Sequence, residues 1–440
     1  MFNVQVFLCS EHIVLMTAHT THVQPDAYKW LILTLAALTF TLVVAIPQMS
    51  LPVLFDEISA DIGLNLVQVG WIWGVGSAMG ILVGLIGGPV GDRFGPRRTL
   101  AVACLFIGIA GAARGLSNSF AMLAFTVLIT GFAQWSIPMN VHKACGVWFS
   151  KKQLGMANGV VSVGMALGFL SGSLLAATVF SPLLGGWRNV LFVYGAVAVL
   201  FGAFWWFSQE KARDEDRQSN QMITLREAIG HVIHLRNVWL LCIATAGVSG
   251  GVNGVLGYLP LYLRGLGWEP AIADSTLASF HAASMTCAIP IALLSDRVGS
   301  RRGVLMAAVL LIGTGTGLLG FASGVLISVA VIIAGIARDG FMAITMTAVI
   351  EEKGVGARFA GSAIGLNISL MGITNVFAPP AGNWLAQFGS GLPFLFWASL
   401  VFLGFTAYFF LQKPATGIKG IGQKIKGSKN DNSKCERNTD

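Results

Sequence analysis

Two residues of opposite charge, Arg338 and Asp339, stand side by side inside the apolar stretch IIAGIARDGFMAITMTAV, which runs from Ile332 to Val349. A charge at the centre of a bilayer costs about 2.5–3.5 kcal/mol, so a membrane helix that carries two of them needs a reason to keep them. A guanidinium is a rigid planar fork of donors that matches a carboxylate or a similar oxyanion. Arg338 is therefore predicted to bind an anionic substrate, and Asp339 to position Arg338 or to bind a coupling proton.

The depth of this pair supports that hypothesis but leaves a second one open. At about 1.5 Å per residue, Arg338 lies roughly 20 Å from either end of a predicted helix over Gly324–Ile350, near the middle of a membrane. Neighbouring residues on a helix point about 100° apart, so we expect one of the two side chains to face a cavity and the other a neighbouring helix. Alternatively, the two charges form a buried ionic network that ties helices together and binds no substrate.

Polar and aromatic residues on other apolar segments could line the same cavity. The candidates, besides Arg338, are Gln134, Trp135, Asn253, Tyr258, His281 and Asn375. The imidazole of His281 could also titrate near neutrality. Each of these side chains fits a hydrogen bond between packed membrane helices as well as a ligand contact, and both roles stay open.

The composition indicates the kind of element that positions these residues. Hydrophobic residues make up 55% of the 440 positions, charged residues 11%, and the mean hydropathy is +0.72, which excludes an ordinary soluble domain. A bilayer core about 30 Å thick requires roughly 20 apolar residues per helix. Twelve segments meet this requirement: Trp30–Phe55, Val67–Val90, Thr99–Leu116, Phe120–Val141, Ala157–Ser181, Asn189–Phe207, Val238–Leu263, Ala273–Leu294, Gly303–Ala322, Gly324–Ile350, Gly361–Phe388 and Leu392–Leu411.

The basic residues predict the orientation of these helices. Of the 28 Lys and Arg residues, only Arg114, Arg188 and Arg264 fall in the loops of one side, apart from Arg338 inside a span. Short cytoplasmic loops collect Lys and Arg, so both termini are predicted to be cytoplasmic, in an inner (plasma) membrane. The net charge of +8 follows from this bias and from a basic C-terminal tail that we expect against anionic membrane lipid. Nucleic-acid binding is not needed to explain it.

Processing and metal signals are weak. The first 28 residues are too polar for a further span and lack the pattern of a signal peptide, and Met16 offers an alternative start. The six cysteines are scattered singly without a CxxC pair, so we interpret them as buried apolar residues. No metal or cofactor is predicted.

The chain repeats itself across a polar linker at 209–237. GPVGDRFGPRRTL (Gly88–Leu100) recurs as ALLSDRVGSRRGVL (Ala292–Leu305), and ITGFAQWS (Ile129–Ser136) recurs at the same spacing as IAGIARDG (Ile333–Gly340). Such duplication is typical of carriers built from two helical halves. We therefore predict a cytoplasmic tail (1–29), a six-helix bundle (30–208), a cytoplasmic linker (209–237), a second six-helix bundle (238–411) and a basic tail (412–440).

These features resemble the major facilitator superfamily, over nearly the whole chain. The resemblance implies an all-α membrane protein whose twelve transmembrane helices form two pseudo-symmetric bundles that rock about one central site. It also implies a conformational latch in the repeated Asp-Arg-x-Gly-x-Arg-Arg loops, where the Asp bridges to the other bundle. The matching residues are Gly88, Asp92, Arg93, Gly95, Arg97 and Arg98 in the first loop and Asp296, Arg297, Gly299, Arg301 and Arg302 in the second.

Partners for the two loop carboxylates are predicted from the repeat. Arg358 and Lys152 occupy matching positions just before the predicted segments Gly361–Phe388 and Ala157–Ser181. The N-terminus of a helix itself favours a nearby carboxylate. We expect Asp92 to pair with Arg358 and Asp296 with Lys152. An alternative is that the loop arginines only set the topology.

The function predicted from the sequence is secondary transport. One arginine, one carboxylate and one histidine at depth are too few for catalysis, so the chain is not expected to be an enzyme. Drug/proton antiporters of this superfamily usually carry an Arg where Val127 stands, and a Gly-Pro pair where Phe169 follows Gly168. Both differences weigh against an efflux antiporter. We predict a monomeric carrier that takes up a small anionic organic solute with protons. The alternatives are a proton-coupled efflux antiporter, a channel with a charged constriction, and a receptor of the same fold that transports nothing.

Overall fold

The computed structural model describes residues 28–84, 94–209, 225–298 and 300–411. This part of the chain consists of helices and connecting turns, without a β-strand. It contains twelve helical stretches that are long and apolar enough to cross a membrane, which confirms the predicted number.

Six of these stretches precede residue 210. Several are built from two or three helical pieces, because short π or 3-10 turns interrupt the α-helix. The pieces are α1 (Tyr28–Leu38), η1 (Thr39–Ala45), α2 (Ile46–Ile62), α3 (Leu66–Val75), α5 (Pro96–Ala113), η2 (Arg114–Leu116), α6 (Phe120–Trp148), α7 (Lys151–Leu175), η3 (Ala176–Phe180), α8 (Ser181–Leu184) and α9 (Trp187–Phe207).

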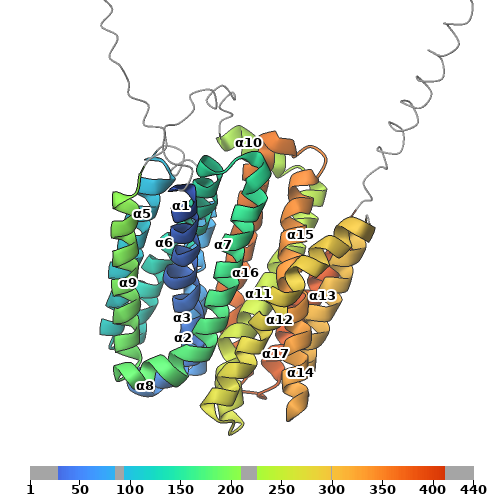
Figure 1. Ribbon diagram of the computed structural model, residues 1–440. Helices are drawn as coiled ribbons and strands as arrows, with labels where there is room; N and C mark the ends of the chain where they lie inside the picture. Colours follow the sequence, from blue (N-terminus) through green and yellow to red (C-terminus); the bar gives the residue numbers. More distant parts are fainter. Residues whose placement is uncertain (1–27, 85–93, 210–224, 299, 412–440) are drawn as a thin grey trace, which may run out of the picture.

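The other six follow a short helix in the linker, α10. They are drawn in yellow to red in Figure 1, with α13 and α14 on the opposite side of the molecule from α5 and α9. The pieces are α10 (Leu225–Val232), α11 (Arg236–Gly265), α12 (Pro270–Val298), α13 (Arg301–Leu318), α14 (Val325–Ile336), α15 (Arg338–Glu351), α16 (Gly356–Leu385) and α17 (Leu392–Phe409).

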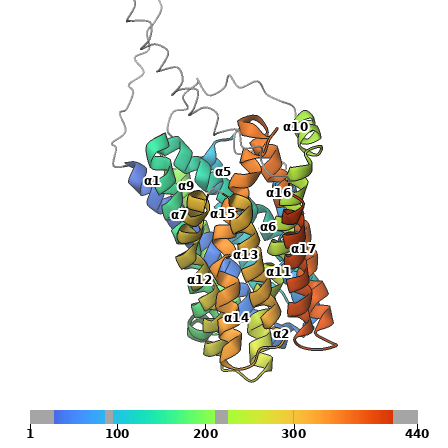
Figure 2. The same cartoon turned by 90° about the vertical axis from the view of Figure 1, so that its right-hand side faces the viewer.

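The two ends of the molecule are distinct. The start of α1 and helix α10 lie at one end in both views, while the end of α2 lies at the other (Figures 1 and 2). The α2 end also holds the turn between α11 and α12 and the turn between α13 and α14. We call it the distal end, since it lies away from the described chain ends.

The two groups of six helices meet most closely where α3 packs on α16. A Cβ atom at Gly74 would lie 2.5 Å from the Val376 carbonyl oxygen, and one at Gly70 would lie 2.7 Å from the Pro380 Cα. Only glycine allows two helix backbones to approach this far. The indole Nε1 of Trp73 adds a hydrogen bond to the Asn253 carbonyl of α11, at 2.7 Å. This seam fixes how the residues of one half face those of the other.

Candidate functional site

The helix that carries the charged pair is interrupted at the pair itself. Helix α14 ends at Ile336, α15 begins at Arg338, and Ala337 between them is fully buried. The Asp339 backbone N–H donates to the hydroxyl oxygen of Ser284 on α12, at 3.1 Å. The start of α15 presents the positive end of a helix dipole, which favours the Asp339 carboxylate in its first turn.

Arg338 lines the cavity described below, Asp339 meets Ser284 of the neighbouring helix α12, and the two side chains also contact each other. The Arg338 Nη1 and the Asp339 Oδ1 form an ion pair. The Cβ atoms of neighbouring residues do diverge on a helix, but the long arginine side chain can fold back across that angle. Both side chains stay partly accessible, at 24% and 26% exposure, so the pair is open to a competing ligand.

A cavity of about 100 Å³ adjoins Arg338, and residues from both halves of the chain line it. Of the predicted lining, the structure brings Trp135, Asn253, Arg338 and Asn375 to this cavity. Among the described lining residues Arg338 is the only charged one. The lining also includes Gln48, Met49, Ser77, Phe169, Val248, Ser249, Val252, Leu256, Met342 and Met371.

One polar wall of the cavity is a small hydrogen-bond network between α11 and α16. The Ser249 hydroxyl donates to the Asn375 Oδ1 at 2.9 Å, and the Asn253 Nδ2 donates to the Asn375 backbone carbonyl at 3.2 Å. Ser249 and Asn253 are four residues apart, so they share one helix face, and this spacing could have identified Ser249 from the sequence. The network fixes two amide groups near Arg338.

The structure does not bring three predicted residues to the cavity lining. Tyr258 is 4% exposed and packs among aromatic rings of its own half, including Tyr262 and Trp397. Gln134 is half-buried on α6, outside the lining. His281 lies one layer behind, 4% exposed against the ring of Phe169, and its Nε2 has no hydrogen-bond partner among the described residues.

The first repeated loop ends in an arginine that holds a helix end. Gly95 precedes α5 with a φ of 79°, a conformation that glycine adopts without strain. Arg97 donates through Nε to the Trp205 carbonyl oxygen at 3.4 Å and through Nη2 to the Trp206 carbonyl oxygen, at the end of α9. The Trp205 carbonyl oxygen also accepts from the backbone N–H and the hydroxyl of Ser208. A cation at the carbonyl end of a helix is favoured by the helix dipole, so Arg97 stabilises this helix end.

The second loop uses a different arginine in the same way. Arg302 donates to the carbonyl oxygens of Leu411 and Phe409 at the end of α17, at 2.9 and 2.8 Å. Arg301 instead pairs with Glu351 at 2.9 Å. In both halves, therefore, a loop arginine ties the start of the third helix to the end of the sixth.

The predicted latches are only partly within the described structure. Gly88, Asp92, Arg93 and Gly299 lie outside the described residues, as does the side chain of Arg358, so the pair of Asp92 with Arg358 stays a prediction. Asp296 and Lys152 are both exposed, and no ion pair joins them in the part of the chain that the structure describes. Arg297 is exposed as well. The second latch also stays a prediction.

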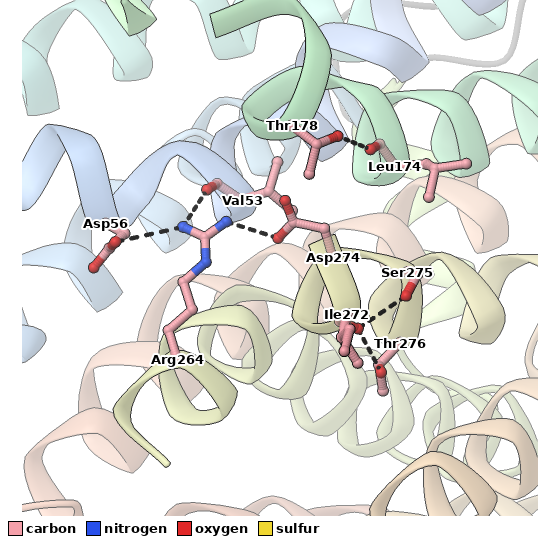
Figure 3. Close-up of polar contacts among 9 residues, drawn as sticks. All are labelled: Val53, Asp56, Leu174, Thr178, Arg264, Ile272, Asp274, Ser275 and Thr276. Atoms are coloured by element: carbon pink, nitrogen blue, oxygen red, sulfur yellow. Dashed lines mark hydrogen bonds and ion pairs between the residues drawn. The ribbon is translucent and has the colours of Figure 1, made fainter. Parts of the chain in front are cut away.

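A second Arg–Asp pair, which the sequence did not single out, joins the two halves at the distal end (Figure 3). Arg264, at the end of α11, donates through Nη2 to the Asp274 Oδ1 of α12 at 2.8 Å. Its Nη1 reaches into the other half, to the Val53 carbonyl oxygen at 2.9 Å and the Asp56 carboxylate at 3.7 Å. We call these four residues the distal gate, because they join α2 of one half to α11 and α12 of the other.

Comparison with known proteins establishes the family. The model of the Major Facilitator Superfamily matches residues 30–350 and 266–430. The chain belongs to this superfamily, whose members are transporters and not enzymes.

Two curated relatives carry names of anion transporters. The chain is 28% identical over 292 residues to a "Probable nitrate/nitrite antiporter" of Thermus thermophilus, a match that spans 63% of each protein and so less than two thirds of that relative. It is 24% identical over 398 residues to a "Probable sulfoacetate transporter" of Cupriavidus necator, covering 84% of this chain and 91% of the relative. A solved bacterial homologue of the human lysosomal transporter Spinster, inward-facing and occupied, shares the fold, with a TM-score of 0.70, 17% identity and coverage of 88% of this chain and 99% of that one.

Proposed function

We propose that this protein carries a small anion across the membrane by alternating access, with Arg338 as the anchor for the anion. The observation that carries the proposal is the position of Arg338, the only charged residue among the described lining of a cavity between the two halves. The amides of Asn253 and Asn375 supply neutral donors beside it, while Trp135 and Phe169 supply apolar walls. A pocket with a few fixed polar groups and apolar walls is typical of a small-molecule site. The names of the two curated relatives agree with an anionic substrate.

The ion pair suggests how a proton accompanies the anion. Arg338 is neutralised by Asp339 in this structure. An incoming anion competes for the same guanidinium. The displaced Asp339 carboxylate then loses its neutralising positive charge while it is still partly buried. Protonation of Asp339 removes that cost. Binding of the anion and of a proton therefore favour each other, which is the basis of symport.

We further propose the topology and direction predicted above. Both termini would lie in the cytoplasm of an inner (plasma) membrane, with 30–208 and 238–411 as the two moving bundles. The distal gate would then close the extracellular side, and uptake would follow the inward proton gradient. We propose that one chain forms the transport unit, since the two halves of the chain together line the cavity.

The test is stabilisation of the purified protein by ligands. A ligand that binds only the folded state raises the melting temperature by mass action, and at 100 times its Kd the gain is about 2.7 kcal/mol. We expect a carboxylate or an inorganic oxyanion from a panel to stabilise the wild type but not Arg338→Gln. The control is Arg188→Gln, which removes an arginine that pairs with Asp61 outside the cavity. Stabilisation of the wild type and Arg338→Gln alike by cations or neutral solutes would contradict the proposal.

A further inference from the structure

The distal gate holds more negative than positive charge. Arg264 is the one cation in it, and its side chain is 9% exposed. It faces Asp274 from α12, which is fully buried, and Asp56 from α2, which is 59% exposed. Glu57, also on α2, adds its charge from nearby. One guanidinium therefore stands against three carboxylates, and Asp274 has the least access to water of the gate's charged groups.

The Asp274 carboxylate is incompletely satisfied where it is buried. Its Oδ1 accepts from Arg264, but its Oδ2 has no hydrogen-bond partner among the described residues. In Figure 3 the hydroxyl of Thr178, on η3, donates to the Leu174 carbonyl oxygen at 2.6 Å and not to Asp274. A buried carboxylate oxygen without a donor is unfavourable, whereas the neutral acid keeps Oδ1 as an acceptor for Arg264 and loses the charge.

Opening of the gate would change these surroundings. The bonds from Arg264 to Val53 and Asp56 join the two halves, whereas the bond to Asp274 lies within one half. When the halves separate at the distal end, Arg264 can stay with Asp274 while water reaches the second carboxylate oxygen. The ionised form of Asp274 is therefore favoured in the open gate and disfavoured in the closed one.

We propose that Asp274 is a proton-binding site of the distal gate, occupied while the gate is closed and emptied when it opens. The inference rests on the proposed alternating access but not on the identity of the substrate. It places a proton site away from Arg338 and Asp339. By linkage, protons favour the closed gate, so a rise in pH on the distal side opens it, by up to about tenfold in the open-to-closed ratio per pH unit for one proton.

The test measures access to the cavity from the distal side. Ser249→Cys places a thiol in the cavity lining, in a chain whose six native cysteines are replaced by alanine. A membrane-impermeant maleimide is added to reconstituted vesicles in which the distal end faces outward, from pH 5.5 to 8. Rates are divided by those of a cysteine at the exposed Glu269, which corrects for the reactivity of the thiol itself. No substrate is present.

We expect the corrected rate to rise with pH, and Asp274→Asn to make it slow and independent of pH, because the amide imitates the neutral acid. Asp274→Glu should retain the pH dependence of the labelling rate. That result would show that a flat profile in Asp274→Asn comes from the missing acid and not from damage to the fold. Asp61→Asn, at an exposed carboxylate of α2 that pairs with Arg188, is the matched control and should behave like the parent.

A pH profile that is flat in the parent, or that survives in Asp274→Asn, would overturn the assignment. Anion-induced stabilisation is measured separately on the wild type, in which Ser249 keeps its hydrogen bond to Asn375. Absence of that stabilisation would refute the anion proposal while leaving the gate result readable, so the two failures are distinguishable.

Discussion

The protein carries two Arg–Asp pairs in the same half, and they differ in almost every physical respect. Arg338 and Asp339 are adjacent in one interrupted helix, and both side chains are about a quarter exposed beside a cavity. Arg264 and Asp274 come from two neighbouring helices, and their side chains are 9% and 0% exposed. The first pair is accessible to a solute, and the second is closed off from it.

The difference shows how the same two residue types can serve binding or closure. A partly hydrated pair is weak, so an anion can displace the carboxylate from the arginine at little cost. A buried pair is held by its surroundings, since separating it strands a charge away from water. The arginine of the buried pair also bonds across to Val53 and Asp56, which gives it a mechanical role that Arg338 lacks.

The sharpest way to break this comparison is to remove each arginine in turn. Arg264→Met removes the hydrogen bonds to Asp274 and to the Val53 carbonyl oxygen. At pH 8, where the ionised form of Asp274 is most populated, we expect the free energy of unfolding to fall by about 1.5–3 kcal/mol. The loss should shrink toward pH 5.5, because the unpaired acid can then take a proton. Arg338→Met leaves the partly exposed Asp339 carboxylate without its partner, and we expect the free energy of unfolding to fall by about 1 kcal/mol or less. Thermal unfolding of the purified variants at both pH values measures the difference.

The double variant Arg264→Met/Asp274→Leu is the control for this prediction. It removes both charges together, so most of the stability at pH 8 should return. Equal losses for Arg264→Met and Arg338→Met would show that burial does not distinguish the two pairs.

A smaller effect is expected from removing the carboxylate of the accessible pair. Asp339→Asn frees Arg338 from its competitor, so the anion that stabilises the wild type most should bind about fivefold more tightly, equivalent to about 1 kcal/mol. Its affinity should also lose its dependence on pH between 6 and 7.5, because the group that takes the proton is gone. Titration calorimetry at the two pH values measures both. An unchanged pH dependence would mean that Asp339 is not the titrating group.

The sequence predicted the accessible pair but not the buried one, for a physical reason. Arg338 and Asp339 interrupt an apolar run, and a charge inside such a run is visible without any tertiary structure. Arg264 and Asp274 lie near the ends of their helices, where charges are ordinary, and Arg264 was counted only as a loop residue. Arg264 meets α2 of the other half, and Asp274 lies on α12, which packs against α7 and η3 of the other half. Helix periodicity carries no information about these contacts.

In the rest of the fold and in the cavity too, apolar patterning reveals some features, whereas others are decided only by tertiary packing. Twelve helices followed from hydropathy and length, and the paired lining residues Asn253 and Asn375 followed from polarity within apolar segments. Tyr258 has the same polarity but faces an aromatic cluster of its own half, since the side of a helix that meets the other half is set by packing. The interruption of the helix at Ala337 could not be predicted either, because no proline or glycine stands at that position.

The smallest effect concerns the contact that lies between the two regions. Trp73 of α3 donates to the Asn253 carbonyl at the cavity wall and meets the ring edge of Phe55 on α2, the helix that also carries Asp56 of the distal gate. Trp73→Phe removes one neutral hydrogen bond between the halves, worth about 0.5 kcal/mol, so the cavity thiol should become about twofold more accessible from the distal side. Trp71→Phe is the matched control, because Trp71 contacts Phe377 through its ring alone. If Trp73→Phe raises the labelling rate at every pH by the same factor, the seam and the gate hold the halves together independently. If it also flattens the pH profile, closure at Asp274 depends on the seam, and the cavity and the gate act as one unit.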